Sequence, residues 1–213
     1  MSGQKSRAQK PSQRRDLTVE KIVEAALEVL KSSDPSALTM RRVAEQCGVS
    51  AMAIYHHVND KTQLATLAVD SIFLAAAKAP RAGLDWRDRY VDLWETIRVG
   101  LIETPGAGMI WVSQAVIGPG TATATEEMFR LLEEGGLTGP AIAEANDAMT
   151  MLSIGSVAND LTRPPNIRHE LGKQVPAQDT PLLQENMATY ADRNGAERYR
   201  IAIRWILDGV TQR

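Results

Sequence analysis

The sequence predicts an all-α protein of about ten helices, with a small N-terminal three-helix domain joined to a larger helical domain. Of its 213 residues, 44% are hydrophobic and 23% are charged, which is typical of a globular chain that buries a core. Aromatic residues make up only 5% while alanine is abundant, and this favours closely packed helices. No segment sustains the alternation of Val, Ile and Thr that is typical of a strand. The helical patterns divide the chain into residues 1–16, 17–61 and 62–213.

Residues 17–61 predict three short helices, each with a favourable N-cap. The first covers residues 18–31 and begins at Thr18, whose hydroxyl can accept a hydrogen bond from the first turn. Thr39 begins the second helix and Ser50 begins the third. Two capped helices set this close together are uncommon, so we expect a compact unit here.

The second and third helices have the spacing of a helix-turn-helix, in the segment TMRRVAEQCGVSAMAIYHHVNDK at residues 39–61. Ala44 allows the two helices to approach each other, and Gly48 can take the positive φ that a sharp turn requires. Ile54 supplies an apolar contact between them. Such a unit presents a helix N-terminus to a DNA major groove. An ordinary helical hairpin is the alternative, but several independent positions agree, and we expect DNA binding.

Seven further helices are expected in the C-terminal part. Gly-Pro and Pro-Gly pairs separate segments whose apolar residues recur at helical spacing. These segments are residues 61–79, 85–104, 107–117, 121–134, 140–160, 181–193 and 195–211. Residues 161–180 contain Pro164, Pro165 and Pro176, and we expect them to form a long loop.

The charges of the chain are divided between its two ends. Residues 1–61 contain 10 Lys or Arg against 7 Asp or Glu, whereas the remainder contains 14 against 19. This separation suits a protein whose N-terminal end meets nucleic acid. Residues 1–16 are basic and lack apolar periodicity, so we expect a disordered arm. Additional phosphate or minor-groove contacts on DNA are the alternative for this arm.

Several other classes of protein are not expected. Cys47 is the only cysteine, which excludes an internal disulfide and a multi-cysteine metal site. Neighbouring His56 and His57 diverge by about 100° on a helix, so we expect no metal site. No G-x-S-x-G, HExxH or phosphate-loop motif is found, and we expect neither an enzyme nor a cofactor. An apolar run of about 20 residues is also missing, so we expect a cytoplasmic protein without a membrane partner.

Residues 17–67 resemble the N-terminal domain of TetR (tetracycline-repressor-like) transcriptional regulators. The strings LTVEKIVEAALEVL, LTMRRVAEQCGVS and AIYHHVNDKTQL carry the resemblance, with Val58 in place of the commoner Phe, as in the tetracycline-repressor branch. The resemblance implies a homodimer that binds double-stranded operator DNA through this domain. It also implies a helical regulatory and dimerisation domain that binds a small molecule.

The predicted recognition helix begins with residues that cannot hydrogen-bond to bases. Ala51 and its neighbours can read only DNA shape or a thymine methyl group. Arg41 matches a family arginine that enters the groove, and we expect it to hydrogen-bond to a base. His57 is expected to pack or to form a hydrogen bond internally. The predicted DNA-binding residues, including those that the resemblance implies, are Thr39, Arg41, Arg42, Ser50, Ala51, Met52, Ala53, Tyr55, His56 and Lys61.

Two further sets of residues are predicted in the regulatory domain. Apolar residues with Asn146, Asp147 and Gln114 as polar partners could line a ligand cavity, although plain core packing is the alternative for most of them. The predicted ligand set is Trp86, Trp94, Met109, Trp111, Gln114, Met128, Asn146 and Met149. The long small-residue helix and the apolar final helix could pair with their copies in a second chain. The predicted dimer set is Ser153, Ser156, Val157, Ile201, Trp205 and Ile206.

We therefore expect a sequence-specific DNA-binding transcriptional regulator. The favoured form is a homodimeric repressor that a small apolar or amphipathic ligand releases from its operator. The alternative is a DNA-binding activator or protein-regulated factor without a small-molecule ligand.

Overall fold

The computed structural model describes residues 17–174 and 176–211, and these residues form eleven α-helices, two short 3₁₀-helices and no strand. The all-α prediction is confirmed. The predicted N-terminal arm, residues 1–16, lies outside the described residues. Within the described ranges, no helix is both long enough and apolar enough to cross a membrane.

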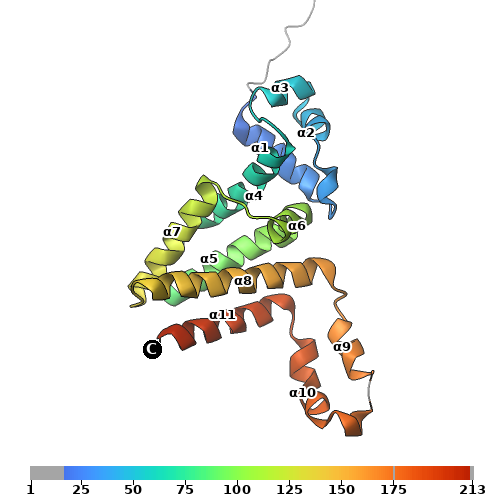
Figure 1. Ribbon diagram of the computed structural model, residues 1–213, viewed down its shortest axis with the longest axis vertical. Helices are drawn as coiled ribbons and strands as arrows, with labels where there is room; N and C mark the ends of the chain where they lie inside the picture. The colour runs from blue at the N-terminus through green and yellow to red at the C-terminus, as the bar shows by residue number, and fades with distance from the viewer. Residues whose placement is uncertain (1–16, 175, 212–213) are drawn as a thin grey trace, which may run out of the picture.

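The N-terminal helices form a small head at one end of the molecule (Figure 1). Its elements are α1 (Val19–Leu30), η1 (Pro35–Ala37), α2 (Met40–Cys47) and α3 (Ala51–Tyr55). The long helix α4 (Lys61–Lys78) begins in the head and runs into the rest of the molecule. The three predicted N-caps are confirmed: the hydroxyls of Thr18, Thr39 and Ser50 each accept a backbone N–H from the first turn.

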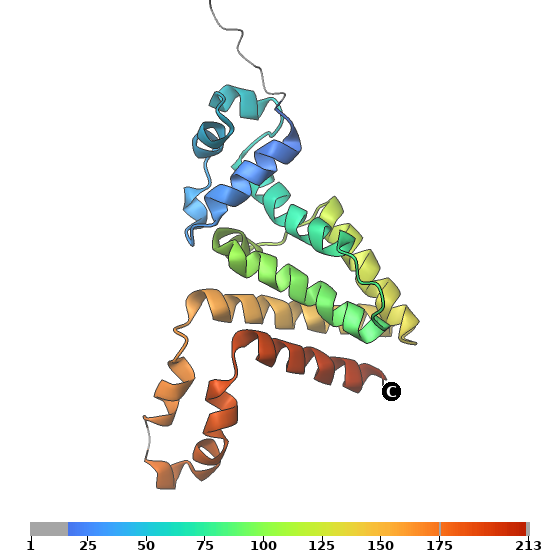
Figure 2. The ribbon, with the colours of Figure 1, turned by 180° about the vertical axis from the view of Figure 1, so that it is seen from behind.

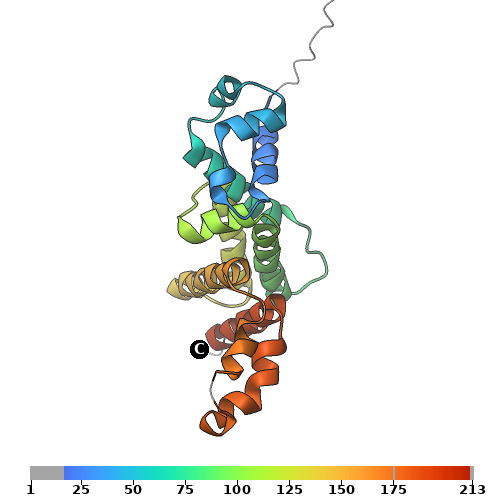
Figure 3. The same ribbon diagram turned by 90° about the vertical axis from the view of Figure 1, so that its right-hand side faces the viewer.

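The remaining helices form a larger helical body. They are α5 (Trp86–Glu103), α6 (Pro105–Ser113), α7 (Pro119–Glu134), α8 (Pro140–Thr162), α9 (Ile167–Gly172), η2 (Ala177–Asp179), α10 (Pro181–Asp192) and α11 (Gly195–Thr211). Helices α8 and α11 lie side by side below α5, as both face-on views show (Figure 2). Seen from the side, the head, the body and the α9–α10 pair follow one another along the long axis (Figure 3).

One hydrophobic core runs through both parts of the molecule. Buried residues of the head such as Leu30 and Leu64 belong to the same cluster as Trp94, Leu131 and Ile203 of the body. Leu30 and Leu64 are far in sequence from Leu131 and Ile203, yet all four residues belong to one continuous apolar cluster. The head is therefore packed onto the body rather than tethered to it.

The prediction of a loop at residues 161–180 was wrong. This segment contains α9 and the 3₁₀-helix η2. Pro164 and Pro165 stand before α9, and Pro176 is the residue that precedes η2. Proline is tolerated before a helix and at its first position because the first backbone N–H groups need no intrahelical partner. These prolines therefore begin short helices here instead of excluding them.

Candidate nucleic-acid interface

The turn between α2 and α3 has the geometry that the sequence predicts. Gly48 ends α2 in the left-handed conformation, with φ of 68°, which an L side chain rarely adopts. The N–H of Val49 donates to the carbonyl of Ala44 at 3.0 Å and closes the turn. The Ser50 hydroxyl then accepts the N–H of Ala53 at 3.3 Å and begins α3. A left-handed glycine followed by a capped helix fixes the direction in which α3 leaves α2.

Buried apolar residues hold α3 against the rest of the head. Ile54 on α3 and Val43 on α2 have no exposed surface, and Ala44 is almost as completely buried. Val58, just beyond α3, closes the same contact. Because α3 is only one and a half turns long, this packing rather than helix propensity must stabilise it.

The outer face of α3 is open to solvent. Met52 is 67% exposed, and Tyr55 at the end of the helix is half exposed. Ala51 and Ala53 are partly covered. The first N–H groups of any helix lack intrahelical partners and carry a partial positive charge, which suits a phosphate oxygen. The exposed start of α3 can therefore approach a duplex without rearrangement of the head.

The predicted basic and polar contact residues surround α3 at the same end of the molecule. Arg41 and Arg42 lie on α2, His56 follows α3, and Lys61 begins α4; all four are exposed. Arg41 forms an ion pair with Glu45, with its Nε 2.9 Å from Oε1. An exposed i, i+4 pair of this kind contributes only about 0.3–0.5 kcal/mol, so Arg41 can leave it for a base at little cost.

The prediction that His57 packs internally was wrong, because its side chain is exposed. Helix α3 ends at Tyr55, and the buried position that follows is taken by Val58, whose N–H donates to the Ile54 carbonyl at 3.0 Å. His57 thus joins the exposed surface beside the predicted contact residues.

A capping arrangement at the start of α4 was missed in the sequence. Asp60 accepts the N–H of Gln63 at 2.8 Å, and the Gln63 side chain accepts the N–H of Asn59 at 2.6 Å. The spacing of an acidic residue and a glutamine three positions later is the signal that indicates such a reciprocal cap. This cap fixes the position of Lys61 relative to α3.

Helix α4 is joined to the body by a buried carboxylate. Asp70 is only 6% exposed, and its two oxygens accept the N–H groups of Gly120 and Thr121, at 2.8 and 2.7 Å. These N–H groups belong to the first turn of α7, where a negative charge is stabilised by the helix dipole. A side chain at Gly118 or Gly120 would collide with the Asp70 carboxylate. Helix α4, which begins beside α3, is thereby bound to α7.

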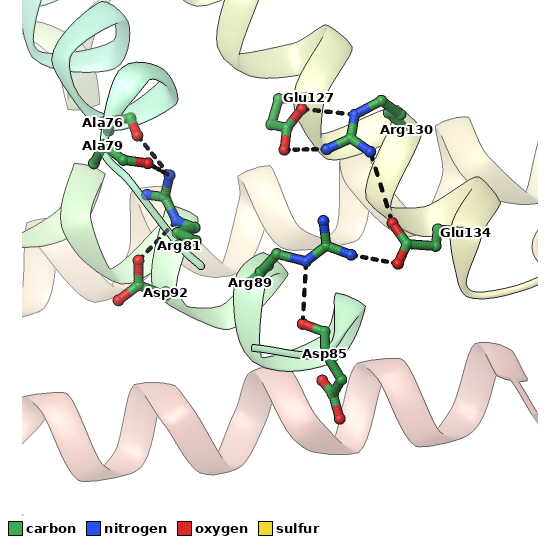
Figure 4. A network of polar contacts seen from close by, with 9 residues as sticks. All are labelled: Ala76, Ala79, Arg81, Asp85, Arg89, Asp92, Glu127, Arg130 and Glu134. Atoms are coloured by element: carbon green, nitrogen blue, oxygen red, sulfur yellow. Dashed lines mark hydrogen bonds and ion pairs between the residues drawn. The ribbon is translucent and has the colours of Figure 1, made fainter. Parts of the chain in front are cut away.

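Polar contacts fasten the far end of α4 to α5, and α5 in turn to the end of α7 (Figure 4). Arg81 donates to the carbonyls of Ala76 and Ala79 at 2.9 and 3.0 Å, and its Nε lies 2.7 Å from a carboxylate oxygen of Asp92 on α5. Arg89 of α5 pairs with Glu134 at the end of α7, to which Arg130 also extends. Helix α4 is therefore held both at its middle and at its end.

The predicted ligand residues divide into a buried and an exposed group. Trp94, Met128 and Met149 come from three different helices and are almost fully buried in the common core. Trp111 is also buried, whereas Trp86, Met109 and Asn146 are partly exposed. The prediction that Gln114 and Asp147 are interior polar groups was wrong, because both are exposed. Gln114 lies just past α6 in an extended conformation that directs it out of the core.

Three buried polar atoms near this group have no hydrogen-bond partner: Tyr90 Oη, Trp94 Nε1 and Asn146 Oδ1. Burial raises the pKa of Tyr90, so its hydroxyl stays protonated. Nearby, Tyr199 of α11 uses its hydroxyl to bond Ser153 Oγ of α8 at 2.6 Å. Buried polar atoms without partners are uncommon in folded proteins.

The predicted dimer residues also divide into two groups. Ser153 and Val157 are buried inside the protomer, so their assignment to an interface is corrected: α5 and α11 already cover this face of α8. Trp205 is 71% exposed, and Ile201, Ile206 and Ser156 are partly exposed. An exposed tryptophan of this size on a long helix is the kind of surface that a partner covers.

The head matches a known family of regulators. Residues 22–67 match the family described as bacterial regulatory proteins, tetR family. The chain is 29% identical over 142 residues to an HTH-type transcriptional regulator of Saccharopolyspora erythraea, in a match that covers 67% of this chain and 60% of that protein. The chain thus spans about three fifths of that relative. It is 24% identical to the tetracycline repressor protein class A from transposon 1721 of Escherichia coli, over 90% of this chain and 89% of the repressor.

The fold also resembles that of a solved regulator. Apo ActR from Streptomyces coelicolor has a TM-score of 0.77 and 23% identity, over 92% of this chain and 95% of ActR. ActR in complex with actinorhodin has a TM-score of 0.76 and 22% identity, over 92% of this chain and 96% of ActR. At this level of identity, the likeness concerns the fold alone.

Proposed function

This chain belongs to the tetR family of bacterial regulatory proteins, and on that premise we propose that it is a homodimeric transcriptional repressor. In this proposal it binds double-stranded operator DNA and is released by a small apolar or amphipathic ligand. The observation that carries the proposal is the start of α3: a short helix directed by a left-handed glycine, capped by Ser50 and open to solvent at Met52.

In the proposed complex, the first turn of α3 enters the major groove. Met52 and its alanine neighbours contact base edges through apolar surface, and Arg41 supplies the hydrogen bonds that discriminate between bases. Tyr55, Lys61 and the capping Thr39 contact phosphates on either side of the groove. All of these residues lie at one end of the molecule, on α2, α3 and the start of α4.

In the proposed dimer, each of the two heads reads one half-site of the operator. The exposed face of α8 and α11 is the proposed contact between the two copies. Trp205 on α11 and Met151 on α8 are 71% and 65% exposed. Both helices are long and lie side by side, so their copies would form a four-helix interface with two-fold symmetry. That symmetry places the two α3 helices on successive half-sites.

Release by a ligand would act through α4. This helix begins beside α3 and is bound to α7 by Asp70 and to α5 by Arg81. A ligand that moved α5 or α7 would therefore move the start of α4 and change the separation of the two heads. The structure of ActR with actinorhodin supports ligand binding by a protein of this fold.

A regulator without a small-molecule effector is the second candidate. The tight packing of Trp94, Met128 and Met149, each at most 2% exposed, favours it because no room is left beside these three side chains. A titration in which no small molecule changes operator affinity would decide for this candidate.

The proposal is tested with the purified full chain and duplexes from the promoters adjacent to its own gene. We expect a dimer in sedimentation and a preference for one promoter over random duplex at moderate salt. With about six phosphate contacts per dimer, the logarithm of affinity should fall with the logarithm of salt concentration at a slope of about −5. A monomer that binds promoter and random duplex equally would refute the proposal.

A further inference from the structure

A basic cavity lies where the end of α8, helix α9 and the start of α11 meet. Two adjoining hollows, of about 450 and 480 Å³, are formed there. Volumes of this size suit a small molecule. The residues that line both hollows are Asn159, Asp160, Arg163, Arg168, Gly195 and Arg198. We call this space the arginine cavity.

The arginine cavity has more positive than negative charge. Arg163, Arg168, Arg193 and Arg198 line it, and within residues 17–174 and 176–211 none of the four forms an ion pair with a carboxylate. Positive side chains this close to one another repel unless an anion lies between them. The four arginines therefore outnumber the two carboxylates of the lining, Asp160 and Asp192.

The carboxylates at the cavity wall are already engaged by other groups. Asp160 pairs with Arg98, whose side chain is 5% exposed and whose Nε donates to Ser156 Oγ at 2.9 Å. Asp192 lies 2.9 Å from His169 Nε2. The Asp160 carboxylate lies so close to Gly195 that a side chain at this position would collide with it and with Arg98.

The guanidinium groups are held in place in the absence of an anion. Arg168 stacks over the Tyr190 ring, with its Cζ 5.2 Å from the ring centroid. Arg198 donates to the backbone carbonyl of Arg193. Burial, followed by the charge of Arg168, lowers the pKa of Arg198. An anion between Arg168 and Arg198 would remove the repulsion between the two guanidinium groups. Because both side chains are already held in place, little further ordering of them is needed for the anion to bind.

We infer that the arginine cavity is a binding site for a small oxyanion, a molecule with a carboxylate or phosphate group held by Arg163, Arg168 and Arg198. Guanidinium groups pair with both kinds of oxyanion through two parallel hydrogen bonds. The three arginines come from the turn after α8, from α9 and from α11. A bound anion would thus tie the α9–α10 pair to the α8–α11 pair, which is a role separate from DNA reading and from the buried core.

The test is a titration of the full chain with inorganic phosphate and with succinate, each at an ionic strength matched with chloride. Binding is followed by calorimetry and by the shift of the unfolding temperature. We expect at least one of the two anions to bind more tightly than chloride. Arg168→Gln and Arg198→Gln should each weaken that binding at least tenfold. Arg204→Gln is the matched control, because Arg204 is an exposed arginine of α11 outside the cavity, and it should change nothing.

The results distinguish the anion and the alternatives. Binding of phosphate alone or of succinate alone identifies the head group. Circular dichroism confirms that each variant folds, and Arg163→Gln at the exposed rim provides a second variant if Arg198→Gln does not fold. Absence of binding beyond the chloride control overturns the inference. Weaker self-association of the arginine variants without anion binding also overturns it, since the arginines would then pair with acidic residues of a second copy. Neither result depends on DNA binding.

Discussion

Replacing Asp70 by Asn tests whether one buried carboxylate joins α4 to α7. The carboxylate accepts two backbone N–H groups, from Gly120 and Thr121, at 2.8 and 2.7 Å. Asparagine keeps one oxygen for one of these donors but presents its own NH₂ group to the other. One charge-assisted bond is lost, worth about 1.5–3 kcal/mol, and a buried donor is left without an acceptor. We expect Asp70→Asn to lower the free energy of unfolding by about 2–3 kcal/mol.

The assay is urea denaturation of both proteins at one protomer concentration, because the proposed self-association would make stability depend on concentration. The same loss corresponds to a fall in unfolding temperature of roughly 4–12 °C for a chain of this size. Asp85→Asn is the matched control: Asp85 caps α5 by accepting the N–H of Asp88 at 2.8 Å, and it is exposed. Asparagine caps a helix as well as aspartate does, so this change should cost under about 0.5 kcal/mol. Equal losses in the two variants would refute the reasoning.

Three further predictions concern the head. Ile54→Ala removes a side chain with no exposed surface and should cost about 2–5 kcal/mol in urea denaturation; a loss under 1 kcal/mol would contradict the packing described for α3. Arg41→Gln should leave stability unchanged, because its ion pair is exposed, but should relax discrimination at one operator base pair by about 1–3 kcal/mol in a binding assay on single-base variants. Hydrogen bonds from Ser36 lower the pKa of Asp34, so their stabilisation is present above the ordinary pKa of Asp34 and is lost as the pH falls through the lowered one. Ser36→Ala should raise the pKa of Asp34 in an NMR titration, and an unchanged pKa would contradict this assignment.

The head could be predicted well because its signals are local. Thr18, Thr39 and Ser50 each bond an N–H three residues ahead, so a cap is visible in four consecutive residues. The role of Gly48 could be predicted for the same reason, since the turn requires a positive φ that glycine adopts readily. His57 was misplaced because α3 ends at Tyr55, and only the path of the chain beyond it decides which side chain is buried.

The body was less predictable because burial there depends on which helices meet. The small residues of α8 indicated close helix packing, but they could not indicate whether the partner belongs to the same chain or to a second one. In the structure, Ser153 bonds Tyr199 of α11 inside the protomer, and Val157 is fully buried. Trp205, by contrast, stays exposed in the protomer.

The sequence alone determined the helical class and the capped head, because each depends on groups within one or two helical turns of one another. Only the tertiary structure decided that Asp70 binds the start of α7 and that Arg98 forms an ion pair with Asp160. It also decided that one cavity is lined by Arg163, Arg168 and Arg198. These partners are separated by up to 62 positions in the chain. Their meeting depends on how the apolar faces of the helices pack, and that packing is a property of the whole core rather than of any local pattern.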